Sequence, residues 1–388
     1  MALAKIKELL IKRQQTAGAR RLRPEDVERM ATMFASVESG DVRARPSKYW
    51  EELNKMNLAQ LQEHGYENFK RTIALNYFTF ARILPWDAQF RFLLRRLTPR
   101  AIARCLKGAL LASKHEYFSS FNGIQSVLYN FLTLASWEFT RHAVSDASLL
   151  ALREPADGNP AAINDPSGAL ISQDLASSIL EISSMGAGLA PGSVVLELGA
   201  GYGRDAYALL TTQPGIKYII VDIPPALWVA ETYLRRQFPN RRIFRYREFA
   251  NFEEIESEFR NSDISFFLST QIAKLPDGLA DLAINISSLH EMRLEQISFY
   301  FSQFDRLLKN DGVFYFKQWK RGAVLFENVV IRQEDYPIPA GWVCELSRQA
   351  PLQTSFFEAR YRKPQDLVGH SNQRGDIVPP RPNPRLGG

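Results

Sequence analysis

The sequence predicts an α/β protein in which a doubly wound sheet follows an all-helical region. From residue 194 onward, short apolar runs of strand length alternate with amphipathic segments of helix length. A glycine-rich turn directly follows the first apolar run, as is typical where a strand leads into a helix beneath a nucleotide-like ligand. Upstream, residues 47–152 carry apolar side chains every three or four positions, which indicates helices.

A cluster of chain-breaking residues at positions 153–168 separates these two patterns. We therefore predict four segments. A basic N-terminal arm with a polar stretch covers 1–46, and a helical domain for acceptor binding or oligomerisation covers 47–160. The sheet-bearing domain covers 161–363. A proline-rich tail, 364–388, has too few apolar residues to pack against a core and is expected to be flexible.

The helical segment is predicted from two apolar repeats with helical spacing. The first consists of Phe69, Ile73, Tyr77, Phe80 and Leu84, and the second of Ile124, Val127, Leu128, Phe131 and Leu134. Within the sheet-bearing segment, the expected strands are 194–198, 217–222, 263–269, 280–287 and 313–317. Because these strands are almost continuously apolar, we expect a parallel sheet that helices cover on both faces.

The helices between these strands have recognisable ends. One begins at Arg204 and stops before Pro214, and another follows Pro224 and Pro225 and ends near Phe238. A third helix, after the fourth strand, carries a regular apolar stripe: Leu294, Ile297, Phe301, Phe304, Leu307 and Leu308. Open sheets of this kind bind ligands at the carboxyl ends of their strands.

The net charge of +6 belongs to the N-terminal arm. Residues 1–23 hold one acidic residue, Glu8, and seven basic ones: Lys5, Lys7, Lys12, Arg13, Arg20, Arg21 and Arg23. This arm is either a solvated surface helix or a segment that contacts anionic lipid or an acidic partner. The rest of the chain is neutral and lacks a basic patch with interleaved aromatic residues, so no nucleic-acid partner is expected.

The composition also limits where the protein is expected to be located and whether it is expected to bind a metal. No apolar run approaches the ~20 residues that cross a bilayer, and the N-terminus lacks the apolar core of a secretory signal. A cytoplasmic protein without a membrane span is therefore expected. The two cysteines, Cys105 and Cys344, have no ligand-like spacing, so neither a metal site nor a disulfide framework is predicted.

The first strand ends in a Glu-x-Gly-x-Gly-x-Gly pattern formed by Glu197, Gly199, Gly201 and Gly203. Glycine can adopt backbone angles that other residues avoid, so the chain can turn sharply against a ligand. Asp222 ends the second strand, where a carboxylate can accept hydrogen bonds from both hydroxyls of a ribose and repel a 2′-phosphate. This combination predicts a nucleoside cofactor, S-adenosylmethionine.

Two other interpretations of the glycine turn were weighed. The dinucleotide fingerprint places its third glycine three residues after the second, a position that Arg204 occupies here. NAD therefore fits less well than a cofactor without a pyrophosphate. A glycine turn that binds no ligand is the second alternative, and the matching position of Asp222 argues against it.

Residues just past the later strands complete the predicted site. Gln271 is placed to meet the adenine amino group, with Thr270 beside it, although an unliganded loop remains an equal alternative. The predicted cofactor contacts are Glu197, Gly199, Ala200, Gly201, Tyr202, Gly203, Asp222, Ile223, Thr270, Gln271 and Ser287.

His290 and Glu291 follow the fourth strand and are the predicted catalytic pair. A hydroxyl is a poor nucleophile toward a sulfonium methyl, so a base that removes its proton assists the transfer. Histidine suits this role because its ordinary pKa is near neutrality. Glu291 is the alternative base, or the residue that orients His290, and the pair alone does not make a metal site.

Four stretches resemble those of sugar O-methyltransferases, a family of class I S-adenosylmethionine-dependent methyltransferases found near bacterial polysaccharide and natural-product genes. They are residues 196–204, 221–227, 285–292 and 315–317. The more specific parts are the Asp-Ile-Pro-Pro that begins at Asp222 and the Asn-Ile-Ser-Ser that begins at Asn285. The resemblance covers about residues 150–330, and within the family the Glu of the Glu-Met pair recurs more regularly than the preceding His.

The resemblance implies methylation of a hydroxyl on a sugar or sugar-containing natural product, with the helical region shaping the acceptor site. Candidate acceptor contacts are Tyr117, Asn122, Lys317 and Trp319, because aromatic rings stack on sugars and polar groups bond to their hydroxyls. A homo-oligomer is a further possibility. Two alternatives stay open: methylation of a carboxylate or amine on a small natural product or peptide, and a non-catalytic scaffold that keeps the fold.

Overall fold

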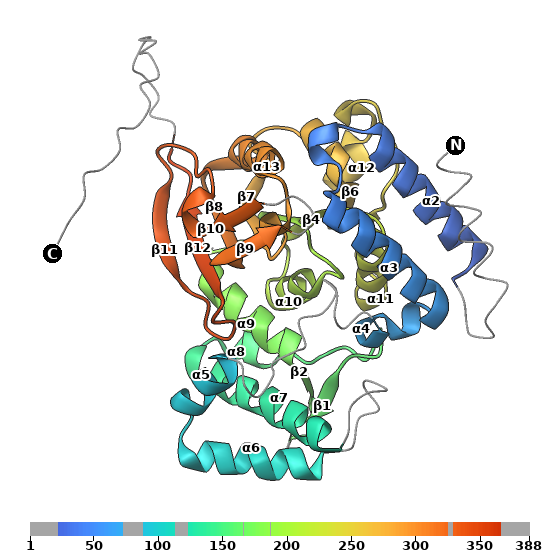
Figure 1. Ribbon diagram of the computed structural model, residues 1–388. Coiled ribbons are helices and arrows are strands. Elements are labelled where there is room, and N and C mark those ends of the chain that lie inside the picture. The colour runs from blue at the N-terminus through green and yellow to red at the C-terminus, as the bar shows by residue number, and fades with distance from the viewer. Residues whose placement is uncertain are drawn as a thin grey trace.

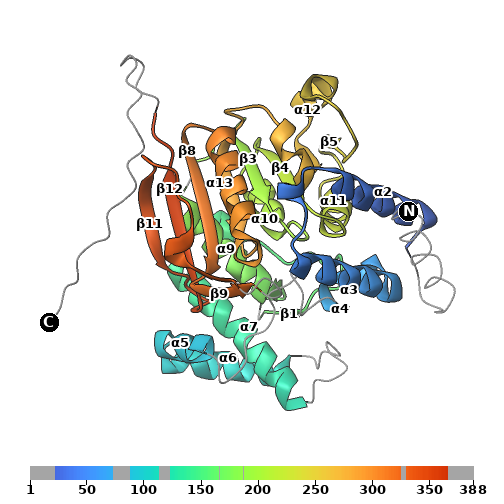
Figure 2. The ribbon, with the colours of Figure 1, turned by 45° about the horizontal axis from the view of Figure 1, so that its top comes forward.

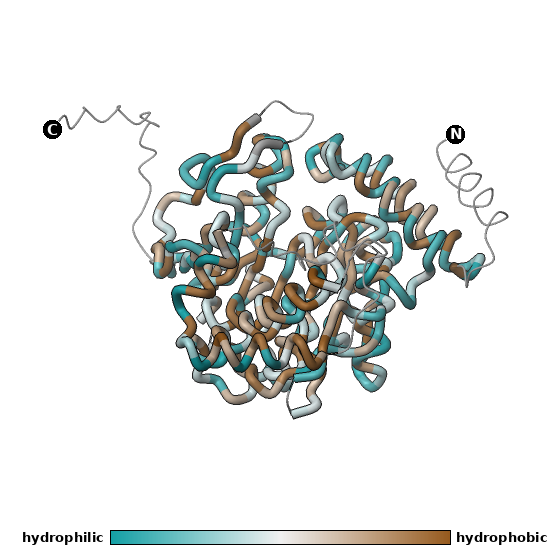
Figure 3. The backbone as a smooth tube through the Cα atoms, turned by 60° about the horizontal axis from the view of Figure 1, so that its bottom comes forward, coloured by the Kyte–Doolittle hydropathy of each residue, from teal (hydrophilic) through white to brown (hydrophobic). Residues whose placement is uncertain are grey.

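The computed structural model describes residues 22–72, 88–112, 123–165, 167–186, 188–324 and 329–365. Its centre is an eight-stranded sheet with helices on both faces, and helices α5, α6 and α7 lie together at one end of the molecule (Figures 1 and 2). Hydrophobic stretches run through the middle of the molecule (Figure 3). No helix within the described ranges is long and apolar enough to cross a membrane.

The strands of the large sheet are ordered β11-β12-β8-β7-β3-β4-β6-β5. Their bounds are β3 Val194–Leu198, β4 Lys217–Asp222, β5 Ile243–Phe244, β6 Ile264–Leu268, β7 Ala280–Ile286, β8 Leu308–Trp319, β11 Val343–Gln349 and β12 Phe356–Arg362. The five strands predicted from the sequence are all present, and 194–198 and 217–222 have the predicted bounds.

The expectation of a wholly parallel sheet is wrong at one edge. The strands from β5 to β8 pair in parallel, whereas β12 pairs antiparallel with both β8 and β11. The edge strand β11 is mostly exposed, so it lacks the continuous apolar run that marked the inner strands. The sheet is therefore mixed and mostly parallel.

Each face of the sheet is covered by its own set of helices. Alternate strand residues such as Val195 and Leu196 point to opposite faces and belong to separate hydrophobic clusters. One face packs against α9 Gln173–Met185, α10 Arg204–Thr212 and α11 Ala226–Gln237. The other packs against α12 Glu256–Asn261 and α13 Leu294–Leu307. This confirms the doubly wound arrangement.

The region before the sheet is helical. It consists of α2 Pro24–Ser39, α3 Lys48–His64, α4 Phe69–Thr72, α5 Ala88–Arg96, α6 Pro99–Leu111, α7 Gly123–Ala143 and α8 Ala147–Leu150. Two short hairpins, β1 Ala162–Asn164 with β2 Leu170–Ser172 and β9 Arg321–Val324 with β10 Val329–Arg332, complete the fold. The second predicted repeat, from Ile124 to Leu134, lies in α7. Ile73, Tyr77, Phe80 and Leu84 lie outside the described residues.

Helix α2 lies in the segment that the sequence analysis treated as an arm and a polar stretch. It begins with Pro24 at its first turn, followed by Glu25 and Asp26, and it buries Val27, Met30, Ala31, Met33 and Val37. This spacing is a helix signal that the basic residues around it obscured. Residues 1–21 and 366–388, which hold most of the predicted arm and tail, lie outside the described ranges.

The chain between α2 and α3 passes close to the carboxyl end of the sheet. The 3₁₀ helix η1, Val42–Ala44, packs against α13, and Ala44 is buried among side chains from that face of the sheet. The main-chain oxygens of Ala44 and Arg45 accept hydrogen bonds from Ser269 and Gln296 respectively. The N-terminal region therefore forms part of the same edge at which ligands bind in such sheets.

Phe69 joins the helical region to the glycine turn. Its ring is fully buried and lies 5.5 Å from the ring of Tyr202, 5.1 Å from Tyr66 and 6.1 Å from Tyr233, measured between centroids. We expect Phe69→Ala to lower the free energy of unfolding by ~3–5 kcal/mol, because it leaves a cavity among these rings. Urea unfolding followed by circular dichroism measures this change.

Met56→Ala on α3 is the matched control, since the Met56 side chain is 52% exposed. It should change the free energy of unfolding by less than ~0.5 kcal/mol. Equal effects of the two substitutions would contradict the assignment of Phe69 as a packing centre.

Candidate active site

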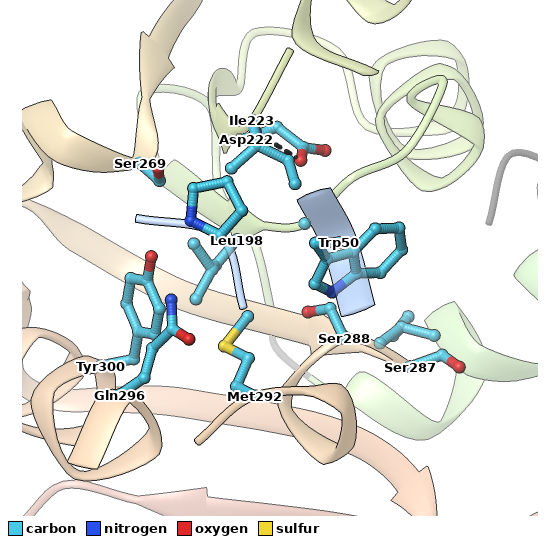
Figure 4. A pocket seen from close by; sticks show the side chains of 13 residues that line it. Trp50, Leu198, Asp222, Ile223, Ser269, Ser287, Ser288, Met292, Gln296 and Tyr300 are labelled. Carbon is cyan, nitrogen blue, oxygen red and sulfur yellow. Dashed lines mark hydrogen bonds between the residues drawn. The ribbon is translucent and has the colours of Figure 1, made fainter. Parts of the chain in front are cut away.

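A pocket opens at the carboxyl ends of β3, β4, β6 and β7 (Figure 4). Its empty volume is about 580 Å³ when the open solvent at its mouth is included. Its lining is mostly apolar. The lining residues are Pro46, Trp50, Leu198, Gly199, Asp222, Ile223, Ser269, Ile286, Ser287, Ser288, Met292, Gln296 and Tyr300.

The glycine turn brings β3 and β7 into close contact. Gly199, Gly201 and Gly203 have φ angles of 75°, 61° and 86°, in the left-handed region that favours glycine. A Cβ atom on Gly199 would lie 2.6 Å from the Ser288 hydroxyl oxygen. Only glycine therefore allows the loop after β7 to approach the turn this closely.

Asp222 is the charged group that lines the pocket. Its Oδ2 accepts a hydrogen bond from the Gly201 N–H at 2.9 Å, and its Oδ1 accepts one from the Ile223 N–H at 2.7 Å. Burial raises the pKa of Asp222 to about 7, although these two N–H groups act in the opposite direction. The carboxylate is thus held in one orientation at the end of β4, as a ribose-binding carboxylate must be.

The other residues of the glycine turn that were predicted to contact the cofactor do not line the pocket. Glu197 is buried on β3 and accepts a hydrogen bond from the Tyr218 hydroxyl at 2.7 Å. Burial, reinforced by the charge of Asp205, raises the pKa of Glu197 well above its ordinary value. Ala200, Gly201, Tyr202 and Gly203 are likewise absent from the lining. Of the predicted cofactor contacts, the pocket brings together Gly199, Asp222, Ile223 and Ser287.

The two residues predicted to meet adenine after β6 face other parts of the protein. Gln271 accepts from the Leu268 N–H at 3.0 Å and donates to the Arg247 main-chain oxygen at 2.9 Å. Thr270 packs so tightly against Gly40 that a Cβ there would lie 2.5 Å from the Thr270 side chain. Ser269 lines the pocket instead, with its hydroxyl donating to the Ala44 main-chain oxygen at 2.9 Å.

Nine lining residues are not among the contacts predicted from the sequence: Pro46, Trp50, Leu198, Ser269, Ile286, Ser288, Met292, Gln296 and Tyr300. Met292, Gln296 and Tyr300 follow one another at intervals of four, so they form one stripe on and before α13. That spacing is a signal that was present in the sequence. Pro46 and Trp50 come from the start of α3, far away along the chain, and only the fold brings them here.

His290 and Glu291 meet at the end of β7, in the 3₁₀ helix η5, Leu289–Glu291. The His290 Nε2 lies 3.5 Å from Glu291 Oε1, and its Nδ1 lies 2.8 Å from Gln318 Oε1. His290 is only 5% exposed. Because the amide oxygen of Gln318 can only accept, Nδ1 carries the proton that it receives and Nε2 is directed at Glu291.

A chain of buried amides holds His290 in place. Gln318 Nε2 donates to Asn285 Oδ1 at 2.6 Å, and Asn285 Nδ2 donates to the Leu198 main-chain oxygen at 2.9 Å. Asn285 and Gln318 are both fully buried. This chain of hydrogen bonds links the glycine turn to the catalytic candidates across β7 and β8.

Glu291 has one oxygen without a partner. Its Oε2 is buried and makes no hydrogen bond within the described part of the chain. Burial raises the pKa of Glu291, while His290 acts to lower it. The Glu291 charge in turn adds to burial in raising the pKa of Tyr49, to about 12, and of Tyr336. Tyr336 also has a buried hydroxyl without a partner in the described ranges.

Two of the predicted acceptor contacts, Lys317 and Trp319, are described and do not line the pocket. Lys317 is buried and donates to Glu181 Oε1 at 2.6 Å, so its charge is neutralised outside the pocket. Trp319 is 43% exposed, with its ring centroid 5.8 Å from that of His290. Tyr117 and Asn122 lie outside the described residues. Over the part of the chain that the structure describes, no group of three His, Cys, Asp or Glu side chains is arranged to hold a metal ion.

No protein-family model matches the sequence, and no curated protein matches it. Among solved structures, the chain is similar to a 1,6-didemethyltoxoflavin-N1-methyltransferase from Burkholderia thailandensis, at 19% identity and a TM-score of 0.34, over 49% of this chain and 77% of that one. It is similar to a SAM-dependent methyltransferase from Aquifex aeolicus at 15% identity and a TM-score of 0.30, over 47% and 88%.

A third similar structure is the [4+2]-cyclase SpnF, at 16% identity and a TM-score of 0.36, over 50% of this chain and 83% of that one. With TM-scores below 0.5, these likenesses carry no argument about what this chain does, because one fold hosts several chemistries. The mixed, mostly parallel sheet with helices on both faces is the doubly wound arrangement that the sequence predicted.

The pKa of Asp222 predicts a pH dependence for any ligand whose ribose it binds. Ribose hydroxyls donate to the ionised carboxylate, so below about pH 7 the protein must first lose a proton. We expect the affinity for 5′-methylthioadenosine, which carries no titrating amino acid, to be level above about pH 7. Below it, affinity should fall by up to about tenfold per pH unit. Isothermal titration calorimetry measures both regions.

Asp222→Asn is the control for this pH dependence. It should weaken binding at pH 8 and remove the loss of affinity on acidification. The effect of pH on folding stability has the opposite sign. Because the pKa of Asp222 is raised in the folded protein, protonation of Asp222 stabilises the fold. This stabilisation is fully present below the ordinary pKa of the group and is lost as the pH rises through about 7. A wild-type affinity that is flat from pH 5.5 to 8 rules out ribose binding by Asp222.

Proposed function

We propose that this protein is an S-adenosylmethionine-dependent methyltransferase that methylates a hydroxyl group of a small acceptor, with a sugar or sugar-containing compound as the first candidate. The single observation that carries the proposal is the pairing of two oriented carboxylates at one edge of the sheet. Asp222 lines the pocket, and Glu291, which is not among the described lining residues, presents an unpaired oxygen in the loop after β7.

The pocket residues fit a nucleoside without phosphates. Asp222 is positioned for a ribose diol, and Leu198, Ile223 and Ile286 supply apolar walls for a base. Among the residues that the structure describes, no Lys or Arg lines the pocket. Arg204, which follows the glycine turn, instead donates to Glu181 at 2.5 Å in a buried ion pair. A pyrophosphate would therefore lack a cation here, which favours S-adenosylmethionine over NAD.

S-adenosylmethionine supplies a methyl group on a positively charged sulfur, which an acceptor oxygen can attack in line. The protein must remove the proton of that oxygen, and Glu291 Oε2 is the group that is free to take it. A raised pKa suits a carboxylate for this role, because it brings the basicity of Glu291 closer to neutral pH. A base of this kind contributes ~10²–10⁴ in rate.

His290 acts through Glu291 as a positioning residue. Its Nδ1 donates to Gln318, and its Nε2 lies 3.5 Å from Glu291 Oε1, so a ring that is protonated on both nitrogens can donate to both partners. It therefore orients Oε1 of Glu291, and Oε2 is left to face the acceptor. This arrangement supports Glu291, and not His290, as the base.

The surroundings of Glu291 support a hydroxylated acceptor. Tyr49 and Tyr336 lie close enough to Glu291 for its charge to affect the pKa of each, and the unpaired hydroxyl of Tyr336 can bond to a second hydroxyl of the acceptor. Aromatic rings beside hydroxyl-binding groups are typical of sugar sites. Tyr49 and Trp50 come from α3, so the helical region contributes to the acceptor side as the sequence analysis proposed.

The alternatives fit these observations less well. A carboxylate acceptor needs no base and would be repelled by ionised Glu291. An amine acceptor can use the same base, so it stays the second candidate. A non-catalytic scaffold gains nothing from an unpaired buried carboxylate oxygen, which costs ~1–3 kcal/mol of stability.

The experiment that tests the function offers the purified protein a panel of sugars and glycosylated compounds with S-adenosylmethionine, and detects the gain of one methyl group by mass spectrometry. With the methylated acceptor, we expect Glu291→Gln to lower kcat by at least about a hundredfold, because it removes the base, and to change the affinity for S-adenosylhomocysteine less than threefold. Glu295→Gln, an exposed neighbour on α13, is the matched control and should retain full activity.

His290→Gln separates positioning from base catalysis. It should lower kcat less than Glu291→Gln and should move the acidic limb of the kcat profile to higher pH, because His290 lowers the pKa of Glu291. Full activity of both variants would falsify hydroxyl deprotonation by this pair. Methylation of carboxylic acids alone, with no product from the sugar panel, would favour the carboxylate alternative.

A further inference from the structure

Gln296 places an unpaired acceptor in the pocket. Its side chain is 3% exposed, and its Nε2 donates to the Arg45 main-chain oxygen at 2.8 Å. Its Oε1 is buried and has no hydrogen-bond partner in the described ranges. Figure 4 shows Gln296 beside Tyr300 and Met292, on the side of the pocket opposite Trp50. A buried acceptor without a donor is costly, so this atom points to a ligand that supplies one.

The Arg45 main-chain oxygen fixes which end of the amide faces the pocket. That oxygen can only accept, so it must receive the NH₂ end of Gln296. The opposite end, directed at the pocket, is therefore the carbonyl oxygen. The ligand must present an N–H or O–H donor at this point. A ligand that presents an acceptor there would bind more weakly, because two acceptors cannot form a hydrogen bond.

This acceptor adjoins the ribose end of the pocket. Burial raises the pKa of Tyr300, and the charge of Asp222 adds to that effect, so the two groups are near each other. The amide of Gln296 in turn interacts with the Tyr300 hydroxyl. Apolar Leu198, Ile223 and Ile286 line the same pocket. A planar base whose ribose binds to Asp222 would therefore lie between apolar walls, with one polar group to contact its edge.

The polar side chains after β6, from which the sequence analysis expected the contact with adenine, already have partners within the protein. Gln271, after β6, already bonds to the Leu268 N–H and to the Arg247 main-chain oxygen. The Ser269 hydroxyl donates to the Ala44 main-chain oxygen. Among the described lining side chains, Gln296 holds the buried acceptor that has no hydrogen-bond partner.

We propose that Gln296 Oε1 accepts a hydrogen bond from the exocyclic amino group of adenine and so selects adenosyl over inosyl cofactors. This inference rests on the proposed S-adenosylmethionine function and assigns base recognition to α13 in place of the loop after β6. Because Arg45 orients the amide, the segment between α2 and α3 also takes part in cofactor selection.

The test compares the binding of S-adenosylhomocysteine and S-inosylhomocysteine by calorimetry. The inosyl compound has a carbonyl where adenine has an amino group, so wild-type protein should bind it at least about tenfold more weakly. Gln296→Met, which keeps the volume and removes the acceptor, should bring the two affinities within about threefold. The ratio of two affinities on one variant is insensitive to the fraction of folded protein.

Two further variants complete the test. Gln296→Glu retains an acceptor and should keep the preference for adenine, and Gln303→Met, a buried glutamine on the same helix, should behave as wild type. If neither ligand binds the wild-type protein, the proposed function fails. If the adenosyl ligand binds in an Asp222-dependent way but Gln296→Met keeps the wild-type preference, the function stands and the assignment of Gln296 is overturned.

Discussion

The orientation of the Gln318 amide determines which nitrogen of His290 faces Glu291. The main-chain oxygen of Leu198 accepts from the Asn285 NH₂ group, so Asn285 Oδ1 is left to receive the NH₂ of Gln318. The Asn285 main-chain oxygen accepts from the same NH₂ group, and the His290 main-chain N–H donates to Gln318 Oε1. Gln318 Oε1 therefore faces His290 Nδ1, and the Nε2 of the ring faces Glu291.

The segment between α2 and α3 exerts a similar control on the other side of the pocket. Its main-chain oxygens at Ala44 and Arg45 receive the side chains of Ser269 and Gln296. Ser47 donates to the main-chain oxygen of Glu291, and Pro46 and Trp50 line the pocket. The helical region thus orients groups that belong to the sheet and its loops. The same segment contacts both the pocket and the loop that carries Glu291.

Sequence reasoning located the strand ends where a short, local pattern marks them. The glycines after β3 and Asp222 after β4 lie at strand ends, and strand ends follow from apolar runs that break at glycine or at charge. His290 and Glu291 follow β7 in the same way, and their catalytic role stays a prediction. The mixed edge of the sheet was missed because β11 is exposed and has no apolar run.

Residues placed by tertiary packing could not be found in this way. Trp50 reaches the pocket from a helix that is remote in sequence, and no spacing reports such a contact. Gln271 was expected in the pocket because of its position, yet it is satisfied by nearby main-chain groups. A polar residue at a strand end therefore indicates a ligand contact only if the local backbone does not already use it. Tyr117 and Asn122 lie outside the described residues and stay predictions.

The polar groups left for ligands at this edge share one chemical character. Asp222 offers carboxylate oxygens, Glu291 offers Oε2, and Gln296 offers an amide oxygen, so all three are acceptors. A phosphate brings only more acceptors and would leave each of these three groups unsatisfied. A ribose diol, an acceptor hydroxyl and an adenine amino group are each donors. This match supports the proposed nucleoside beside a hydroxylated acceptor, and the described lining residues include no Lys or Arg to pair with a phosphate.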